Sequence, residues 1–404
     1  MSFDSLKHQD GAVRALRASV GSQRMPHAFL FVGPRGVGKG LAARELAKRL
    51  LCESPRAGRA GPSARGLAAR RASPGGETAE AGALEPCDRC GHCTRVDRGT
   101  HPDVSWFRKE PDRNDFRISL VTRRPEESPA RVVIEAVTLA PMEGRWTVTV
   151  LDDAELMNEE AANALLKTLE EPAPHAVLVL LCADASRLPG TILSRCQWIR
   201  FRPLPDDFVA DKVRAVLQAE AQAAESGGKN DAAAPGVSDE EIAYAARFAG
   251  GSIERACTLA GSGLWDLKRE ILPRLAAMDE PAALDIAERV AAWSREFAKT
   301  ERTTNESREE TALRREAART ALAAMTSAFR DALVLATVGR GAALVNADQR
   351  QAVERLADWP PEALEGAVAF LADAQGHISR YVHTELATEN ALLQASRLRT
   401  PAAA

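Results

Sequence analysis

A glycine-rich segment from Gly33 to Gly40, Gly-Pro-Arg-Gly-Val-Gly-Lys-Gly, constrains this chain more than any other feature. It follows an apolar run at 28–32 and opens a helical pattern over 41–51. A strand, a glycine-rich loop and a helix in this order are typical of a phosphate-binding loop, or P-loop. The glycines let backbone N–H groups surround phosphate oxygens, and a lysine adds a positive charge. The candidate nucleotide-binding residues of this loop are Gly33, Gly36, Gly38, Lys39 and Gly40.

Position 40 departs from the P-loop pattern. The residue after the lysine is normally serine or threonine, whose hydroxyl binds Mg²⁺, and here it is Gly40. A carboxylate for Mg²⁺ is expected at the end of a later strand. Asp152, which follows an apolar run at 146–151, is the candidate. The alternative reading of this acidic residue is helix capping after a buried strand.

Composition limits the functional classes. A chain of 404 residues with 45% hydrophobic content is long enough for two or three domains. The formal net charge of −3 argues against a general nucleic-acid binder, although a local basic patch stays open. No apolar run reaches the roughly 18 residues of a membrane span, so we expect no membrane contact. The first residues lack a secretory signal, and we therefore expect the cytoplasm.

Strands and helices alternate up to about residue 203. The apolar run at 176–182 is typical of a strand that is buried on both faces of a parallel sheet. We predict a doubly wound parallel α/β domain, with ligands beyond the carboxyl ends of its strands. The chain beyond 205 has helical patterns only, with a capping box at Ser238. The predicted strands are 28–32, 105–107, 146–151, 176–182 and 198–201, and the predicted helices include 6–22, 41–51, 130–139 and 159–171.

Residues 53–85 are rich in Ala, Arg, Gly and Pro and contain few large apolar side chains. Such a segment cannot bury enough surface to offset the entropy lost on ordering. We predict a disordered insertion without a chemical role.

Clustered cysteines follow this insertion, in the segment 86–94. Cys87, Cys90 and Cys93 form two C-x-x-C steps that share the middle cysteine, and Cys52 precedes the insertion. Four thiolates suit a tetrahedral structural Zn(II) site, whereas a redox role is the alternative for C-x-x-C. The fourth ligand is either Cys52 or His92. The remaining cysteines, Cys182, Cys196 and Cys257, are expected to be buried apolar residues.

Several motifs in order resemble the clamp-loader branch of the AAA+ ATPases. The resemblance is greatest from about residue 5 to 203. It implies an AAA+ domain with a zinc-binding insertion over 1–203, a helical lid over 204–272 and an all-α collar over 276–404. The motifs are the P-loop, the cysteine cluster and the segments 27–31, 101–103, 141–146, 160–172, 188–189 and 194–196 (Ser-Arg-Cys).

The resemblance also implies an assembly. Members of this family form a five-subunit ring with subunits of gamma/tau and delta type, which opens a sliding clamp and loads it at primed DNA. ATP lies between neighbours in such a ring, and the arginine of Ser-Arg-Cys serves the neighbour's ATP. Arg195 would therefore act in trans as an arginine finger, stabilising charge on the transferred phosphoryl group. The alternative for Arg195 is an ion pair with a carboxylate of its own domain.

Four departures from active family members fall on the chain's own nucleotide site. They are Gly40, Asp153 in place of glutamate, Ala183 in place of a polar sensor, and Glu254 where the lid has arginine, with Arg255 one position away. Together they predict a subunit that hydrolyses no ATP, while binding of ATP or ADP stays open. The competing hypotheses are an active gamma/tau-type motor and a DNA-contacting zinc module that uses Arg89 and Arg95.

Overall fold

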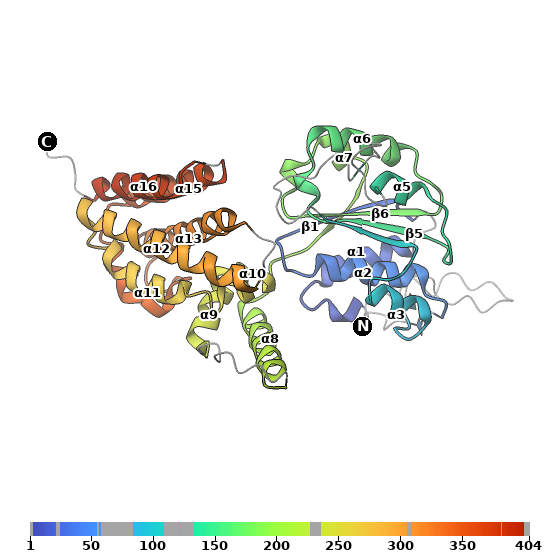
Figure 1. Cartoon of the computed structure of the whole chain (residues 1–404), viewed down its shortest axis with the longest axis horizontal. Helices are drawn as coiled ribbons and strands as arrows, with labels where there is room; N and C mark the ends of the chain where they lie inside the picture. The colour runs from blue at the N-terminus through green and yellow to red at the C-terminus, as the bar shows by residue number, and fades with distance from the viewer. Residues whose placement is uncertain are drawn as a thin grey trace. The chain divides into compact units, whose positions relative to one another are not determined.

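A computed structural model of the chain describes residues 3–21, 25–54, 56–57, 84–108, 121, 132–226, 236–304, 309–380 and 382–399. The chain divides into two compact units, Met1–Pro203 and Leu204–Ala404, and each is described by itself (Figure 1).

The N-terminal unit is built on a five-stranded parallel sheet. Its strand order is β4-β5-β6-β1-β7, and every pairing is parallel. All seven residues of β6 are buried because the strand lies inside the sheet with both faces covered. The predicted parallel α/β fold is confirmed. The strands are β1 (Ala28–Val32), β4 (Val104–Phe107), β5 (Thr147–Leu151), β6 (Ala176–Cys182) and β7 (Gln197–Arg200).

Helices cover both faces of the sheet (Figure 1). Ala28 and Leu30 of β1 belong to a buried core that includes Leu165 of the helix α6. Phe31 points to the opposite face by the alternation of a strand and lies 5.4 Å from the Phe201 ring, centroid to centroid. One face carries α1 (Asp10–Val20), α2 (Lys39–Leu51) and α3 (Gly91–Asp97), and the other carries α5 (Val133–Thr138), α6 (Glu159–Glu170) and α7 (Gly190–Leu193).

Several predicted boundaries differ from the structure. The first helix begins at Asp10 instead of residue 6, because Phe3–Ser5 form the short 3-10 helix η1 and a turn follows it. The helix predicted over 130–139 is described as α5 (Val133–Thr138), and residues 128–131 lie outside the described part.

The prediction of disorder over 53–85 is wrong at both ends of that segment. Strand β2 (Arg56–Ala57) pairs antiparallel with β3 (Leu84–Glu85). Glu85 is buried and accepts hydrogen bonds from the Phe3 N–H at 3.2 Å and from Arg17 Nε at 2.8 Å. These partners are distant in sequence, so local composition could not predict them. Residues 58–83 lie outside the described part of the chain.

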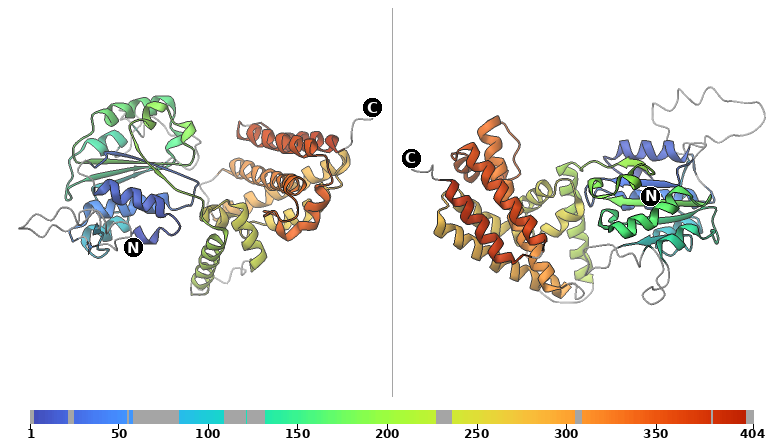
Figure 2. Two further views of the ribbon diagram at one scale, coloured as in Figure 1. Left: turned by 180° about the vertical axis from the view of Figure 1, so that it is seen from behind. Right: turned by 90° about the horizontal axis from the view of Figure 1, so that it is seen from above.

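The described part of the C-terminal unit is helical. Helices α12, α13, α15 and α16 pack side by side, as the orange and red ribbons of Figure 2 show. Ser238 Oγ accepts the Glu241 N–H, and the Glu241 carboxylate accepts the backbone N–H groups of Ser238 and Gly261, so the predicted capping box is present. The helices are α8 (Asp206–Ser226), α9 (Asp239–Phe248), α10 (Ile253–Leu259), α11 (Leu264–Leu275), α12 (Glu280–Thr304), α13 (Glu310–Val338), α14 (Arg350–Leu356), α15 (Pro361–Ser379) and α16 (Thr384–Leu398).

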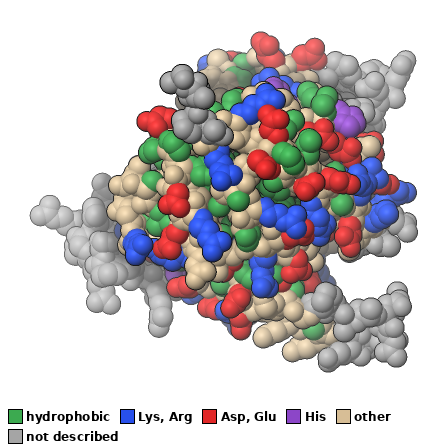
Figure 3. Space-filling view, turned by 90° about the vertical axis from the view of Figure 1, so that its left-hand side faces the viewer, with side chains coloured by type: hydrophobic (Ala, Val, Ile, Leu, Met, Phe, Trp, Pro, Cys, Tyr) green, Lys and Arg blue, Asp and Glu red, His purple; other side chains and the backbone are tan. Residues whose placement is uncertain are grey.

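Among the described residues, one helix, α13, is long and apolar enough by length and composition to cross a membrane. It packs against α12 and α15, as a core helix of a bundle does. The face shown in Figure 3 mixes acidic and basic side chains without a large region of one sign.

Candidate functional site

The carboxyl edge of the sheet gathers the predicted nucleotide site. Because the five strands are parallel, their carboxyl ends lie at one edge of the sheet. The P-loop follows β1 at this edge, Asp152 follows β5, and Ala183 follows β6. The structure therefore places the P-loop, Asp152, Asp153 and Ala183 at one edge of the sheet.

Two glycines of the P-loop are required by the fold itself. A Cβ at Gly33 would lie 2.5 Å from the Phe201 carbonyl oxygen, a distance that no side chain can adopt. Gly38 precedes α2 with a φ of 100°, a left-handed conformation that glycine adopts without strain. The loop shape thus follows from backbone packing as well as from any need to hold phosphate.

The Lys39 side chain is buried against its own loop. Its Nζ donates hydrogen bonds to the carbonyl oxygens of Gly33 at 2.6 Å and Pro34 at 2.7 Å. Burial lowers the pKa of Lys39, although the carboxylates of Glu155 and Asp152 oppose this shift. Two of the three N–H donors of this ammonium are thus used by the loop itself, and a phosphate group would share the ammonium with the two loop carbonyls.

Both acidic residues after β5 are paired with arginines of the same chain. Asp152 lies 3.2 Å from Arg108 Nε, and Asp153 lies 2.6 Å from an Arg35 guanidinium nitrogen. Asp153 also has a φ of 55°, which is uncommon for a residue other than glycine. A Mg²⁺ ion at this edge would compete with two guanidinium groups for its carboxylate ligands.

The packing around position 40 does not require a glycine. A Cβ at this position would meet the Trp106 ring at 3.6 Å, an ordinary van der Waals distance. A serine side chain can therefore enter here, and the missing hydroxyl reflects the sequence and not the packing.

Glu155 is a residue of this edge that the sequence analysis missed. Its side chain is 6% exposed, and Oε2 has no hydrogen-bond partner among the described residues. Burial and then the Glu155 carboxylate raise the pKa of Cys182 to about 12. The signal in the sequence was an acidic residue three positions after Asp152. In the structure its carboxylate adds negative potential beside Lys39.

Arg195 lies between α7 and β7, on the surface. One guanidinium nitrogen donates to Glu170 Oε1 at 2.7 Å, and the other donates to the Thr191 carbonyl at 3.0 Å. The side chains of Arg195 and Glu170 are 36% and 51% exposed. In the isolated chain, Arg195 thus forms an ion pair with a carboxylate of its own domain, which was the alternative to an arginine finger, and this ion pair is exposed.

The two lid positions lie on α10 in the C-terminal unit. Glu254 is exposed, and the Arg255 guanidinium lies 5.0 Å from the centre of the Phe248 ring. Arg255 therefore contacts its own unit through a cation–π interaction.

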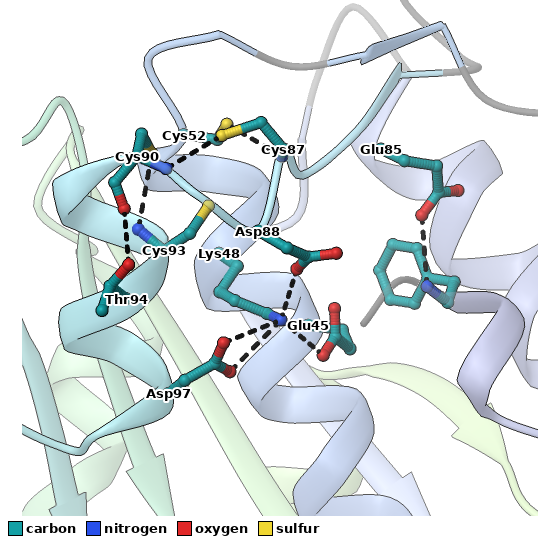
Figure 4. A network of polar contacts seen from close by, with 11 residues as sticks. Glu45, Lys48, Cys52, Glu85, Cys87, Asp88, Cys90, Cys93, Thr94 and Asp97 are labelled. Carbon is teal, nitrogen blue, oxygen red and sulfur yellow. Dashed lines mark hydrogen bonds and ion pairs between the residues drawn. The ribbon is translucent and has the colours of Figure 1, made fainter.

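The structure brings the four cysteines of the predicted metal site together. The Sγ atoms of Cys52, Cys87, Cys90 and Cys93 lie within 4.8 Å of one another (Figure 4). A tetrahedral site with Zn–S bonds of about 2.3 Å needs sulfur atoms about 3.8 Å apart, so small adjustments suffice. The cluster can hold a metal ion by the number, type and spacing of its donors.

Backbone N–H groups already point at three of these sulfur atoms, and one of these contacts is the Cys93 N–H to Cys90 Sγ at 3.5 Å. The Cys87 N–H donates to Cys52 Sγ and the Cys90 N–H to Cys87 Sγ, each at 3.3 Å. Burial would raise the pKa of Cys87, but N–H donors of Arg89 and Cys90 outweigh it and lower the pKa to about 6. Such donors favour the thiolate, which is the form that binds metal, whereas burial raises the pKa of Cys52 and of Cys93.

His92, the rival fourth ligand, is used elsewhere. Its Nδ1 lies 2.7 Å from His101 Nε2, and its Nε2 lies 3.0 Å from a Glu53 oxygen. His101 Nδ1 accepts the Asp103 N–H at 3.1 Å, which leaves its proton on Nε2. We therefore assign two consecutive hydrogen bonds: His101 Nε2–H donates to His92 Nδ1, and His92 Nε2–H donates to Glu53.

This series of hydrogen bonds also argues against a metal ion bound by His92, His101 and Glu143, whose donor atoms lie within 4.8 Å of one another. Since His101 Nε2 carries the proton, it has no lone pair for a metal. Glu143 moreover pairs with Arg95. The described cysteines outside the cluster behave as small residues: Cys182 and Cys196 are buried as predicted, whereas Cys257 is half-buried.

Comparison with known proteins identifies relatives of the N-terminal unit. A family model described as "DNA polymerase III, delta subunit" matches residues 8–205. The subunit tau of DNA polymerase III from Escherichia coli (strain K12) is 31% identical over 219 residues, which are 54% of this chain and 28% of that protein. The subunit delta' from Pseudomonas aeruginosa is 37% identical over 176 residues, which are 44% of this chain and 43% of that protein.

The matches span less than half of the length of these two relatives. Among solved structures, a DNA polymerase III gamma subunit-related protein from Thermotoga maritima aligns over 97% of this chain and 100% of its own length. It does so at 16% identity with a TM-score of 0.39.

Proposed function

Since residues 8–205 of this chain belong to the clamp-loader family of DNA polymerase III subunits, we propose that it is a delta-prime-type subunit. In this proposal the chain hydrolyses no ATP and completes the ATP site of a neighbouring subunit with Arg195. The single observation that carries the proposal is a contrast in the N-terminal unit. The chain's own site lacks the metal-binding hydroxyl at Gly40 and a polar group at Ala183, whereas the arginine of Ser-Arg-Cys, Arg195, is present and lies at the surface.

The chemistry at the chain's own site supports this assignment. Hydrolysis needs Mg²⁺ to bridge the phosphates and a carboxylate to orient water. Gly40 offers no hydroxyl to the metal, Ala183 offers no polar group, and Asp152 and Asp153 form ion pairs with Arg108 and Arg35. The glycine loop and Lys39 keep the shape of a nucleotide site, so ATP or ADP can bind weakly without magnesium coordination.

The trans role follows from the physical chemistry of the guanidinium group. A planar group with several N–H donors matches phosphate oxygens and stabilises charge that develops during transfer. The exposed pair with Glu170 is of a kind worth about 0–1 kcal/mol, so a neighbour's ATP can replace Glu170 at little cost.

The proposed partners are gamma/tau-type and delta-type subunits in a five-membered ring. Through that ring the chain would act on a sliding clamp and primed DNA in the cytoplasm. The four-cysteine cluster would bind structural Zn(II), and the helical unit would supply a lid over 204–272 and a collar over 276–404. The relatives named above include both tau and delta' subunits, which makes an active gamma/tau-type motor the second candidate.

ATP turnover distinguishes the two candidates. The purified chain alone should show no Mg²⁺-dependent ATPase above a Lys39→Ala control. When the loader is assembled from its subunits, Arg195→Ala should lower clamp-stimulated ATPase at the neighbouring site by about 10²-fold or more. Assembly, followed by gel filtration, should not change.

The control is Arg200→Ala, which removes another exposed arginine, one whose guanidinium lies over the Trp198 ring. It should leave ATPase near the wild-type value. Robust turnover by the lone chain that Lys39→Ala abolishes would instead establish the motor.

A further inference from the structure

A fully buried lysine lies beneath the cysteine cluster. The Lys48 side chain is 0% exposed and sits in α2, four residues before Cys52. The Lys48 carbonyl accepts the Cys52 N–H at 2.9 Å. Cys52 is the residue directly after the last residue of α2, Leu51. Lys48 in the last turn of α2 therefore lies one helical turn before a proposed metal ligand.

Lys48 joins three segments of the N-terminal unit (Figure 4). Its Nζ lies 2.8 Å from Glu45 Oε1 on α2, 2.8 Å from Asp88 Oδ1 in the cysteine loop, and 3.2 Å from Asp97 Oδ1 on α3. Asp97 lies on the helix that carries Cys93. The Lys48 ammonium therefore contacts α2, which ends next to Cys52, the loop between Cys87 and Cys90, and α3, which carries Cys93.

Asp88 is the contact that bears on metal geometry. It stands between Cys87 and Cys90 with a φ of 58°, in the left-handed region. This conformation costs a residue with a side chain roughly 1–2 kcal/mol. The turn it makes directs the Cys90 N–H toward Cys87 Sγ at 3.3 Å. An ion pair to a buried lysine gives the turn the support that the strain requires.

Removal of the ammonium would change the charge of this region. Glu45, Asp88 and Asp97 would remain together beside four cysteines. Carboxylates and thiolates repel one another at short range, and burial strengthens the repulsion. Without Lys48 the Asp88 turn would lose its ion pair to a buried ammonium, and the cysteine loop would tend to open.

We propose that Lys48 is a positioning residue of the four-cysteine site, which holds Asp88 in its left-handed turn and thereby sets Cys87 and Cys90 for metal coordination. This inference rests on metal binding by the cluster and is independent of the role of Arg195. Residues that support metal ligands typically contribute 10- to 100-fold to metal affinity.

The test is Co(II) titration of the metal-free full-length chain. Absorption bands from sulfur–cobalt charge transfer report thiolate coordination, and competition with a chelator gives the affinity. Lys48→Met and Asp88→Asn should each weaken Co(II) binding about 10- to 100-fold. The double variant should bind Co(II) about as tightly as the single variant with the lower affinity, because the Lys48–Asp88 contact is already lost in each single variant.

Asp88→Gly separates the turn from the ion pair. Glycine adopts the left-handed conformation without strain, so this variant should bind Co(II) more tightly than Asp88→Asn. It also keeps Lys48 in place, and it remains informative if Lys48→Met fails to fold.

The matched control is Lys268→Met in the C-terminal unit. Lys268 is also 0% exposed and pairs with Asp348, and its Nζ lies 4.1 Å from the centre of the Tyr244 ring. Its replacement should leave Co(II) affinity within about twofold of wild type, since separate sites act independently. Wild-type affinity in Lys48→Met, an equal loss in Lys268→Met, or additive losses in the double variant would overturn the proposal. Absence of a thiolate band in the wild type would overturn it as well, without touching the proposed role of Arg195.

Discussion

Two cationic side chains of the N-terminal unit are suited to phosphate, and they are held in opposite ways. Lys39 is buried and donates to the Gly33 and Pro34 carbonyls of its own loop. Arg195 is exposed and donates to Glu170, which is itself half exposed. One cation serves the loop that carries it, and the other is available at the surface.

Under the proposed function, this difference would explain how a nucleotide-binding fold can lose its own ATP hydrolysis and still serve a neighbour's site. An ammonium with two short hydrogen bonds in a buried site is costly to redirect, because buried polar groups lose heavily when unpaired. An exposed ion pair exchanges its partner at a cost of about 0–1 kcal/mol. The predictions below test this contrast, from the largest expected effect to the smallest.

Arg195→Lys keeps the charge and removes the planar guanidinium. In the assembled loader we expect the neighbour's ATPase to fall about tenfold or more, because lysine cannot donate two parallel hydrogen bonds to phosphate. Steady-state ATPase with clamp and primed DNA measures the effect. Full activity of this variant would reduce the role of Arg195 to charge alone.

Gly40→Ser restores the missing hydroxyl at the chain's own site. We expect Mg²⁺ to increase the nucleotide affinity of this variant about two- to tenfold, because one added hydrogen-bonding group typically contributes about 0.5–1.5 kcal/mol. Titration with a fluorescent ADP analogue, with and without Mg²⁺, measures it.

The control for the added hydroxyl is Gly40→Ala, which places a Cβ in the same contact with Trp106. It should not gain the dependence on Mg²⁺. An equal gain in both variants would assign the effect to packing.

Glu170→Gln removes the charge that pairs with Arg195 in the isolated chain. We expect at most about a fivefold increase in ATPase at subsaturating concentrations of this subunit, since an exposed pair contributes about 1 kcal/mol or less. A loss as large as that of Arg195→Ala would show instead that Glu170 takes part in the shared site.

The pH dependence of stability tests the burial of Lys39. Its folded-state pKa lies below the ordinary value of 10.5, so the unfolded chain binds more protons between the two pKa values. The free energy of unfolding should therefore rise with pH toward 10.5, relative to a Lys39→Met variant. Urea unfolding of both proteins across this range measures the difference, and a flat or falling difference contradicts the burial of a charged ammonium.

Much of the fold was predictable because its signals are local. The buried run at 176–182 forms β6, and the helix predicted over 159–171 is observed as α6 (Glu159–Glu170). The failures concern contacts between distant residues. Glu85, for example, orders the base of the 53–85 segment through Phe3 and Arg17, which no local composition reports.

The sequence by itself determined the P-loop spacing, the missing hydroxyl at Gly40 and the cysteine spacing, since covalent order fixes which groups are present and how far apart they lie along the chain. Only the tertiary structure decided how those groups are used. It placed Cys52 beside Cys87 across the long insertion, turned His92 toward His101, and paired Asp152 with Arg108. These choices depend on the free energy of burying each polar group with a partner, and that partner is known only once the chain has folded.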